Sequence, residues 1–147
     1  MKKSDYSAWA WNKNAGRLTD FALEIDARPV SGSKECLYGV IFRFQDSDNL
    51  YRFLVSGDGY YLVGTKLNGV WTTLQSKTKS AFINQGNSTN HLKLVCQGTR
   101  IEVFVNGHHL TTLTDDSFAE GYVGVIVDTP EPDTRVAFDN IKVYSLD

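Results

Sequence analysis

Residues 38–56, YGVIFRFQDSDNLYRFLVS, carry the clearest fold signal in the chain. Apolar residues recur at every second position in residues 38–45 and again in residues 49–56, which is the period of a β-strand with one buried face. The Asp46-Ser47-Asp48 segment between them is typical of a tight turn. The stretch therefore predicts a β-hairpin, in which two antiparallel strands are joined by a short loop.

The same pattern continues on both sides of this hairpin. Further period-two runs occupy residues 21–27, 60–66, 71–75, 91–96, 100–106, 110–114, 122–127 and 135–144. Short turns such as Gly57-Asp58-Gly59, Asn68-Gly69 and Asn106-Gly107 separate several of these runs. Consecutive hairpins exclude a parallel α/β sheet, and this many short strands predict an all-β fold, an antiparallel two-sheet sandwich.

Length and composition predict a single domain over residues 1–147. The chain is 41% apolar and 22% charged, and its net charge of -2 arises without a run of like charges. This balance argues against a nucleic-acid partner. No stretch reaches the roughly 18 consecutive apolar residues that membrane insertion requires. Residues 1–5 have no apolar segment behind them, so no signal peptide is expected in this chain.

Two interpretations of the cysteines stay open, a disulfide and free thiols. Cys96 alternates with Leu92 and Leu94 in a predicted strand, which favours a buried free thiol. Neither Cys36 nor Cys96 has C-x-x-C spacing, so a redox or metal site is not expected at either.

Six motifs follow one another along the chain. They are F-x-L-E-x-D at residues 21–26, G-V-x-F-R-x-Q-D at 39–46, N-x-Y-R-F at 49–53, I-x-V-x-V-N-G at 101–107, G-x-V-G-V at 121–125 and F-D-N-I-x-V at 138–143. In this order they resemble the concanavalin A-like lectin/glucanase superfamily, and most closely bacterial laminin G-like domains and the 3-keto-disaccharide hydrolase group.

The resemblance spans residues 20–146 and implies a jelly roll of two curved sheets, with the concave face as the ligand surface. It also implies a further strand near the start, so residues 1–14 are expected to form an edge. Two locations stay open, the cytoplasm and the cell surface or exterior. The resemblance favours the second, as part of a longer protein.

Carboxylates offer little support for catalysis. Glycosidases of this fold that resemble laminarinases carry E-x-D-x-E on one strand, and retaining chemistry needs two carboxyl groups about 5 Å apart. The nearest match is Glu24-Ile25-Asp26-Ala27-Arg28, in which arginine replaces the second glutamate, and Glu102 stands alone on its strand. We therefore assign no catalytic residue and expect no organic cofactor.

A structural Ca²⁺ is a further expectation that the resemblance suggests. Asp139 shares the parity of Ile141 and Val143, so it is expected to point inward, where an unpaired carboxylate would be unfavourable. Glu24 or Asp26 could then be its partner around the ion, because Ca²⁺ prefers oxygen ligands. The alternative is that Asp139 accepts hydrogen bonds from backbone amides.

A polar and aromatic group near the first hairpin is the candidate ligand site. Sugars present apolar faces and hydroxyl edges, so their sites combine an aromatic platform with a few fixed polar groups. The residues expected to meet there are Arg43, Gln45, Arg52, Tyr60, Tyr61 and Trp71. In the alternative, Arg43 and Arg52 form ion pairs with Glu24, Asp26 or Glu102.

Together these observations favour a non-catalytic module that binds an oligo- or polysaccharide on the concave face of a sheet. Two alternatives stay open. One is a glycosidase like the 3-keto-disaccharide hydrolases, and the other is a protein-interaction or adhesion domain of a multidomain surface protein.

Overall fold

The computed structural model describes residues 6–11, 16–129, 131 and 133–146, with side chains from Gly16 onward. These residues form eleven strands in chain order. They are β1 (Tyr6–Trp11), β2 (Phe21–Ser31), β3 (Leu37–Asp46), β4 (Asn49–Ser56), β5 (Tyr60–Leu67), β6 (Val70–Lys79), β7 (Asn90–Gln97), β8 (Arg100–Val105), β9 (His108–Thr114), β10 (Tyr122–Thr129) and β11 (Arg135–Ser145).

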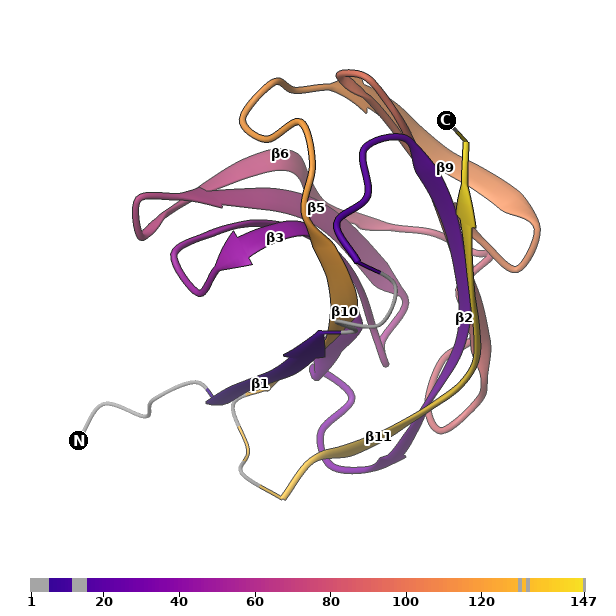
Figure 1. Ribbon diagram of the computed structural model, residues 1–147. Helices are drawn as coiled ribbons and strands as arrows, with labels where there is room; N and C mark the ends of the chain where they lie inside the picture. The colour runs from indigo at the N-terminus through magenta and orange to yellow at the C-terminus, as the bar shows by residue number, and fades with distance from the viewer. Residues whose placement is uncertain (1–5, 12–15, 130, 132, 147) are drawn as a thin grey trace.

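The strands form two antiparallel sheets that pack face to face (Figure 1). One sheet has six strands in the order β1-β10-β3-β4-β5-β6, and the other has five in the order β11-β2-β7-β8-β9. The predicted jelly-roll sandwich is therefore confirmed. The edge expected over residues 1–14 is present at Tyr6–Trp11, where β1 pairs with β10 at one end of the six-stranded sheet, and residues 1–5 and 12–14 lie outside the described residues.

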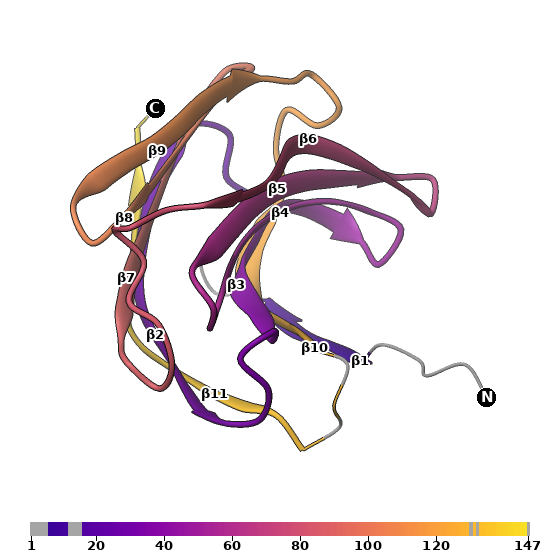
Figure 2. The same cartoon turned by 180° about the vertical axis from the view of Figure 1, so that it is seen from behind.

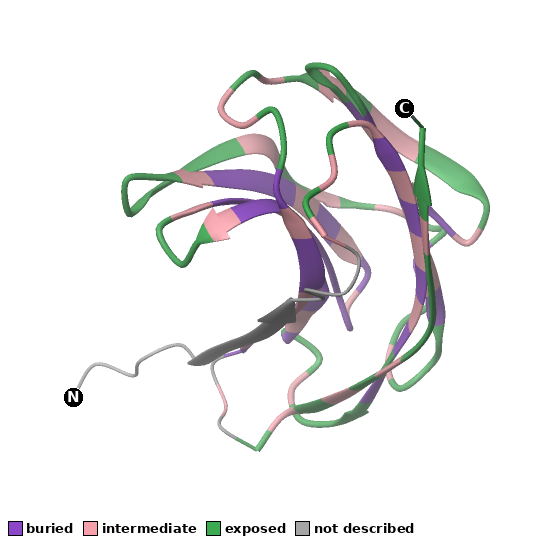
Figure 3. Ribbon diagram, in the orientation of Figure 1, coloured by how far each residue is buried: buried purple, intermediate pink, exposed green. Residues whose placement is uncertain are grey.

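The core lies between the two sheets. Strict alternation builds it along β2, β7 and β8, whereas most of β3 is buried on both faces. On β2, Phe21, Leu23, Ile25 and Ala27 are all buried, and the residues between them are only partly covered. Figure 3 shows the same alternation of buried and intermediate segments along the five-stranded sheet. Each fully buried large apolar side chain stabilises the fold by roughly 1.5–3 kcal/mol, so this stripe holds the two sheets together.

Hairpin turns connect neighbouring strands as their sequences predict. Asn68 and Gly69 have φ values of 52° and 81°, and Asn106 and Gly107 have values of 51° and 82°. Two successive residues with positive φ define the type I′ turn, whose twist matches that of the flanking strands. These two turns join β5 to β6 and β8 to β9.

Both cysteines are buried free thiols, as their sequence context favours. Burial raises the pKa of Cys36 to about 11 and that of Cys96 to about 12. Among the described residues, no helix is long and apolar enough to cross a membrane.

Candidate functional site

The outer face of the six-stranded sheet is concave. Both sheets curve in the same sense, and the six-stranded sheet lies inside the arc formed by the five-stranded one (Figures 1 and 2). Along β4, Tyr51 and Phe53 are buried in the core between the sheets. Because successive side chains point to opposite faces, Arg52 and Leu54 belong to the concave face.

Arg52 lies at the centre of this face. Its Nη1 donates a 2.8 Å hydrogen bond to Oδ2 of Asp128 on β10. Its guanidinium carbon lies 3.8 Å from the centre of the Trp71 ring on β6, which is a close cation–π contact. Gly64 on β5 is the register partner of Arg52, and a Cβ at Gly64 would lie 3.7 Å from the Arg52 Nε. A Cβ at that distance would make an ordinary van der Waals contact, so the Arg52 side chain lies directly over Gly64.

An apolar layer lies beneath these polar groups. Ile41, Leu54 and Ile126 form one cluster on this face and are at most 1% exposed. The Arg52 and Asp128 side chains are 16% and 19% exposed, so their ion pair is screened less than one fully in water. Trp71 remains 39% exposed.

Tyr60 extends the concave face along β5. It is separated from Gly64 by two steps of the strand period, so the two residues share a face. The structure thus brings Arg52, Tyr60 and Trp71 to one surface, as expected. An exposed aromatic ring beside a rigid pair of charged groups is the combination that sugar sites use.

Arg43 is not on this surface, which corrects the expectation that it meets Arg52. It has a φ of 45°, and the β3–β4 register shifts between Phe42 and Asp46. This bulge turns the Arg43 side chain away, and it is 0% exposed. Its guanidinium donates to the backbone carbonyls of Gly98 (2.7 Å), Thr19 (2.9 Å) and Phe118 (3.2 Å).

Gln45 and Tyr61 also lie elsewhere. Gln45 accepts a 2.7 Å hydrogen bond from Nη2 of Arg17 and donates to the Glu120 carbonyl. Tyr61 is 6% exposed in the main core, and its hydroxyl donates to the Leu110 carbonyl at 3.3 Å. Both side chains form hydrogen bonds to residues of other segments, and these partners lie outside the group around Arg52.

Glu24 and Asp26 lie on the outer face of the five-stranded sheet, on the other side of the molecule. Both bind His91 on β7, whose Nδ1 is 2.7 Å from Asp26 Oδ1 and whose Nε2 is 2.8 Å from Glu24 Oε1. Burial lowers the pKa of His91, but the bonds to Asp26 and then Glu24 outweigh it, and the pKa is raised. Hydrogen bonds from Asn140 and His91 lower the pKa of Asp26.

Asp139 is exposed, which corrects the expectation that it points inward. The β11–β2 register shifts between Asp139 and Lys142, and Asn140 has a φ of 54°. This bulge reverses the alternation, so Val143 packs on the core while Ile141 is 42% exposed. Oδ1 of Asp139 accepts a 2.8 Å bond from the backbone amide of Asn140.

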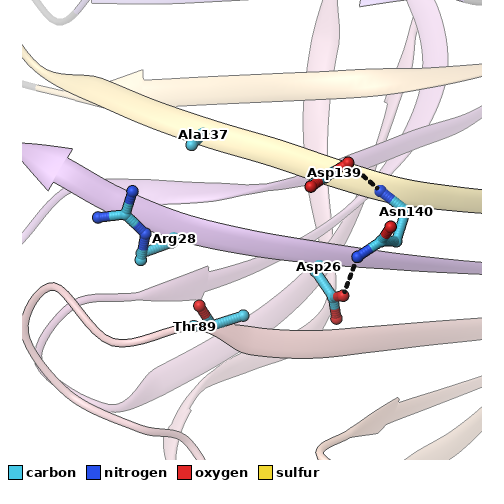
Figure 4. A pocket seen from close by; sticks show the side chains of 6 residues that line it. All are labelled: Asp26, Arg28, Thr89, Ala137, Asp139 and Asn140. Atoms are coloured by element: carbon cyan, nitrogen blue, oxygen red, sulfur yellow. Dashed lines mark hydrogen bonds between the residues drawn. The ribbon is translucent and has the colours of Figure 1, made fainter.

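A pocket of about 210 Å³ lies here, lined by Asp26, Arg28, Thr89, Ala137, Asp139 and Asn140 (Figure 4). Ca²⁺ takes six to eight oxygen ligands. Asp26 already accepts hydrogen bonds from Asn140 and His91. Among the described residues, no group of three or more His, Cys, Asp or Glu side chains could hold a metal ion. The calcium site stays a prediction, and this donor set does not fit it.

Asp128, like Lys66, Lys77 and Lys79, is a residue of the concave face that the sequence did not single out. Its partner Arg52 is 76 positions away, so no local motif connects them. One signal was present, because Asp128 directly follows the predicted strand 122–127 and has the parity of Gly124 and Ile126. A charged residue in that row pointed to a polar group on the outer face.

The family model described as the 3-keto-alpha-glucoside-1,2-lyase-like domain matches residues 2–144. The chain belongs to this family. This match confirms the resemblance to the 3-keto-disaccharide hydrolase group that the sequence motifs indicate. A comparison with curated proteins found no match.

Solved structures share the fold of this lyase-like domain. The carbohydrate-binding module CBM66 from Bacillus subtilis has a TM-score of 0.80 at 22% identity, covering 97% of this chain and 84% of that one. Sheep galectin-11 has a TM-score of 0.66 at 14% identity, with 97% and 99% covered. The GH43 protein BlXynB from Bacillus licheniformis has a TM-score of 0.62 at 13% identity, covering 86% of this chain and 28% of that one. At these identities the likeness establishes the fold.

Proposed function

We propose that this domain is a non-catalytic carbohydrate-binding module that binds a glycan on the concave face of its six-stranded sheet. The observation that carries the proposal is the half-exposed Trp71 ring held beside the Arg52–Asp128 pair. A sugar ring would stack its apolar C–H face on Trp71, while its hydroxyls bond to the guanidinium and carboxylate.

Preorganisation supports this role. Arg52 is fixed by its hydrogen bond to Asp128 and by its stacking on Trp71, so few rotamers remain to be lost on binding. The lectin and carbohydrate-binding module among the similar structures carry the same sandwich. Their names support a glycan ligand for this chain.

An enzymatic role like that in the family's description is the second candidate, and family membership is the observation that favours it. Glu24 and Asp26, the carboxylates that come closest to the E-x-D-x-E motif, lie on the other sheet, where both bind His91. That pair is therefore remote from Trp71. The placement favours binding over hydrolysis by this pair.

Binding is tested with a glycan array and with insoluble polysaccharides in pull-down assays. We expect at least one glycan to bind the native domain. We expect Trp71→Ala to weaken that binding severalfold to about tenfold, since stacking on an aromatic ring is worth about 0.5–1.5 kcal/mol and about 1.4 kcal/mol is tenfold. Tyr144→Ala is the matched control, because Tyr144 is 46% exposed on the other sheet. Binding to no glycan, or equal loss in both variants, would refute the proposal.

The enzymatic candidate is tested by incubating the domain with a 3-keto glycoside and measuring release of the aglycone or the second sugar. Turnover that Asp128→Asn abolishes would establish an enzyme acting on the concave face. Turnover that Asp26→Asn abolishes would place the chemistry on the other sheet.

A further inference from the structure

The concave face carries two aromatic rings, and cations lie over both of them. The Trp71 ring has Arg52 at 3.8 Å and the Lys66 Nζ at 5.4 Å from its centre. The Tyr60 ring has the Nζ atoms of Lys77 and Lys79 at 5.1 Å and 5.6 Å. All but Arg52 of these residues belong to the β5–β6 hairpin.

The charge of this hairpin contrasts with that of the whole chain. The protein has a net charge of -2, yet no Asp or Glu lies between Asp58 and Glu102 in the sequence. Lys66, Lys77 and Lys79 of the hairpin fall within that interval, and its other two cations, Lys93 and Arg100, lie on the five-stranded sheet. The rest of the chain is correspondingly acidic, so positive charge is concentrated here.

The cations at the two ends of the hairpin differ in their partners. Arg52 is paired with Asp128, and Lys66 lies 3.9 Å from Asp48. In the part of the chain that the structure describes, no carboxylate lies within 4.0 Å of Lys77 or Lys79. The Tyr60 end therefore offers an aromatic ring with two uncompensated ammonium groups over it.

Spacing along the hairpin indicates a ligand longer than one sugar. Trp71 is the register partner of Lys66, and Tyr60 is six residues before Lys66 on the same strand. At about 3.3 Å per residue, the two rings stand roughly 20 Å apart. A polymer that contacts both rings must therefore extend along the strand.

We infer that the ligand of this face is an acidic polysaccharide of the polyuronate class. This inference rests on the proposed function and names its ligand. A uronate carries its carboxylate directly on the sugar ring, so a uronate bound at Tyr60 can place that carboxylate against the ammonium groups of Lys77 and Lys79. The charge repeats along the polymer, which matches cations at both ends of the hairpin.

A structural explanation of the lysines also exists. β6 is the edge of the six-stranded sheet, and lysines on an edge strand oppose pairing with other chains. That role predicts that Lys77 and Lys79 affect aggregation and leave glycan affinity unchanged. Affinity measurements therefore separate the two explanations.

The experiment measures affinity by isothermal titration calorimetry at 50 mM and 500 mM NaCl. The probes are polygalacturonate and alginate, with neutral galactan and dextran for comparison. We expect a polyuronate to bind about tenfold or more tightly than either neutral polymer at low salt, and most of that advantage to disappear at high salt because of screening. Dextran sulfate and a single-stranded DNA oligonucleotide are included as other polyanions.

The variant is Lys77→Gln with Lys79→Gln, which removes both uncompensated charges and keeps the length of the side chains. We expect it to lower polyuronate affinity about tenfold at 50 mM NaCl and to reduce the salt dependence. Lys93→Gln is the matched control, because Lys93 Nζ lies 5.5 Å from the Phe104 ring centre in the same kind of contact on the five-stranded sheet. The control should bind like the native domain.

The outcomes separate the inference from the proposed function. Binding of a neutral glycan as tightly as a polyuronate, or an unchanged affinity of the double variant, would overturn the inference and leave the proposed function intact. Equal binding of dextran sulfate or DNA would show a general polyanion surface and would also overturn it. Binding to no glycan at all would remove the proposed function itself.

Discussion

Arg43 is expected to contribute several kcal/mol to the stability of the fold and nothing to glycan binding. Replacing it with Met keeps the apolar stem and removes the buried guanidinium, whose three hydrogen bonds reach backbone carbonyls at 2.7, 2.9 and 3.2 Å. Hydrogen bonds to a charged group are worth about 1.5–3 kcal/mol each. Two of the three carbonyls belong to the exposed residues Thr19 and Gly98, so water can partly replace those bonds.

The expected loss for Arg43→Met is therefore about 3–5 kcal/mol in the free energy of unfolding, in the range found when one partner of a buried charge network is removed. A domain of this kind has roughly 5–15 kcal/mol in total, so the variant should fold but with a clearly lower urea midpoint. Urea denaturation at 25 °C followed by tryptophan fluorescence gives this value.

Arg28→Met is the control, because Arg28 is exposed and its loss should change stability by less than about 0.5 kcal/mol. At urea concentrations where both variants are folded, each should bind glycan like the native domain. A stability loss below about 1 kcal/mol for Arg43→Met, or a selective loss of glycan affinity, would refute the structural role of Arg43.

Three further predictions concern pH, thiol reactivity and strand packing. The raised pKa of His91 means that its contacts with Asp26 and Glu24 stabilise the fold fully below its unfolded pKa of about 6.5, and that this contribution is lost as pH rises through the higher folded pKa. His91→Gln should thus destabilise the domain more at pH 5.5 than at pH 9 in urea titrations, and an equal effect at both pH values would contradict the assignment. Burial raises the pKa of Cys36 to about 11 and that of Cys96 to about 12, so both thiols should resist iodoacetamide at pH 8 in the folded protein. In 8 M urea both should react within minutes, as mass spectrometry would show. Fast labelling without urea would argue against their burial. Gly39→Ala should lower the free energy of unfolding by more than about 3 kcal/mol, because its Cβ would lie 2.0 Å from the Phe53 carbonyl oxygen. Gly64→Ala is the control, because its Cβ would have its nearest contact at 3.4 Å, and it should change stability by less than about 1 kcal/mol in the same assay.

The fold could be predicted from the sequence because the signals that indicate it, strand period and turn residues, are local. The alternation on β2 and the Asn-Gly turns each depend on a few neighbouring residues, so both can be recognised without tertiary information. The site was only partly predictable. Arg52, Tyr60 and Trp71 follow the period of regular strands, and their shared face could be predicted by parity.

Bulges explain the residues for which that reasoning failed. Arg43 and Asn140 both have positive φ values within strands, and each marks a register shift that the sequence pattern does not reveal. One extra residue moves every later side chain to the other face. Arg43 lies within one bulge and turns inward. Asp139 precedes the other bulge, so the parity counted back from Val143 across that bulge does not hold for Asp139, which points outward.

By itself, the sequence determined that this chain is an antiparallel sandwich of short hairpins, because strand period and turn chemistry are properties of adjacent residues. Only the tertiary structure decided which charges meet. Asp128 joins Arg52 across 76 positions, and the curvature of the sheet brings Trp71 against the same guanidinium. Side-chain pairing between distant strands depends on sheet order, register and curvature, and these arise from the packing of the whole domain.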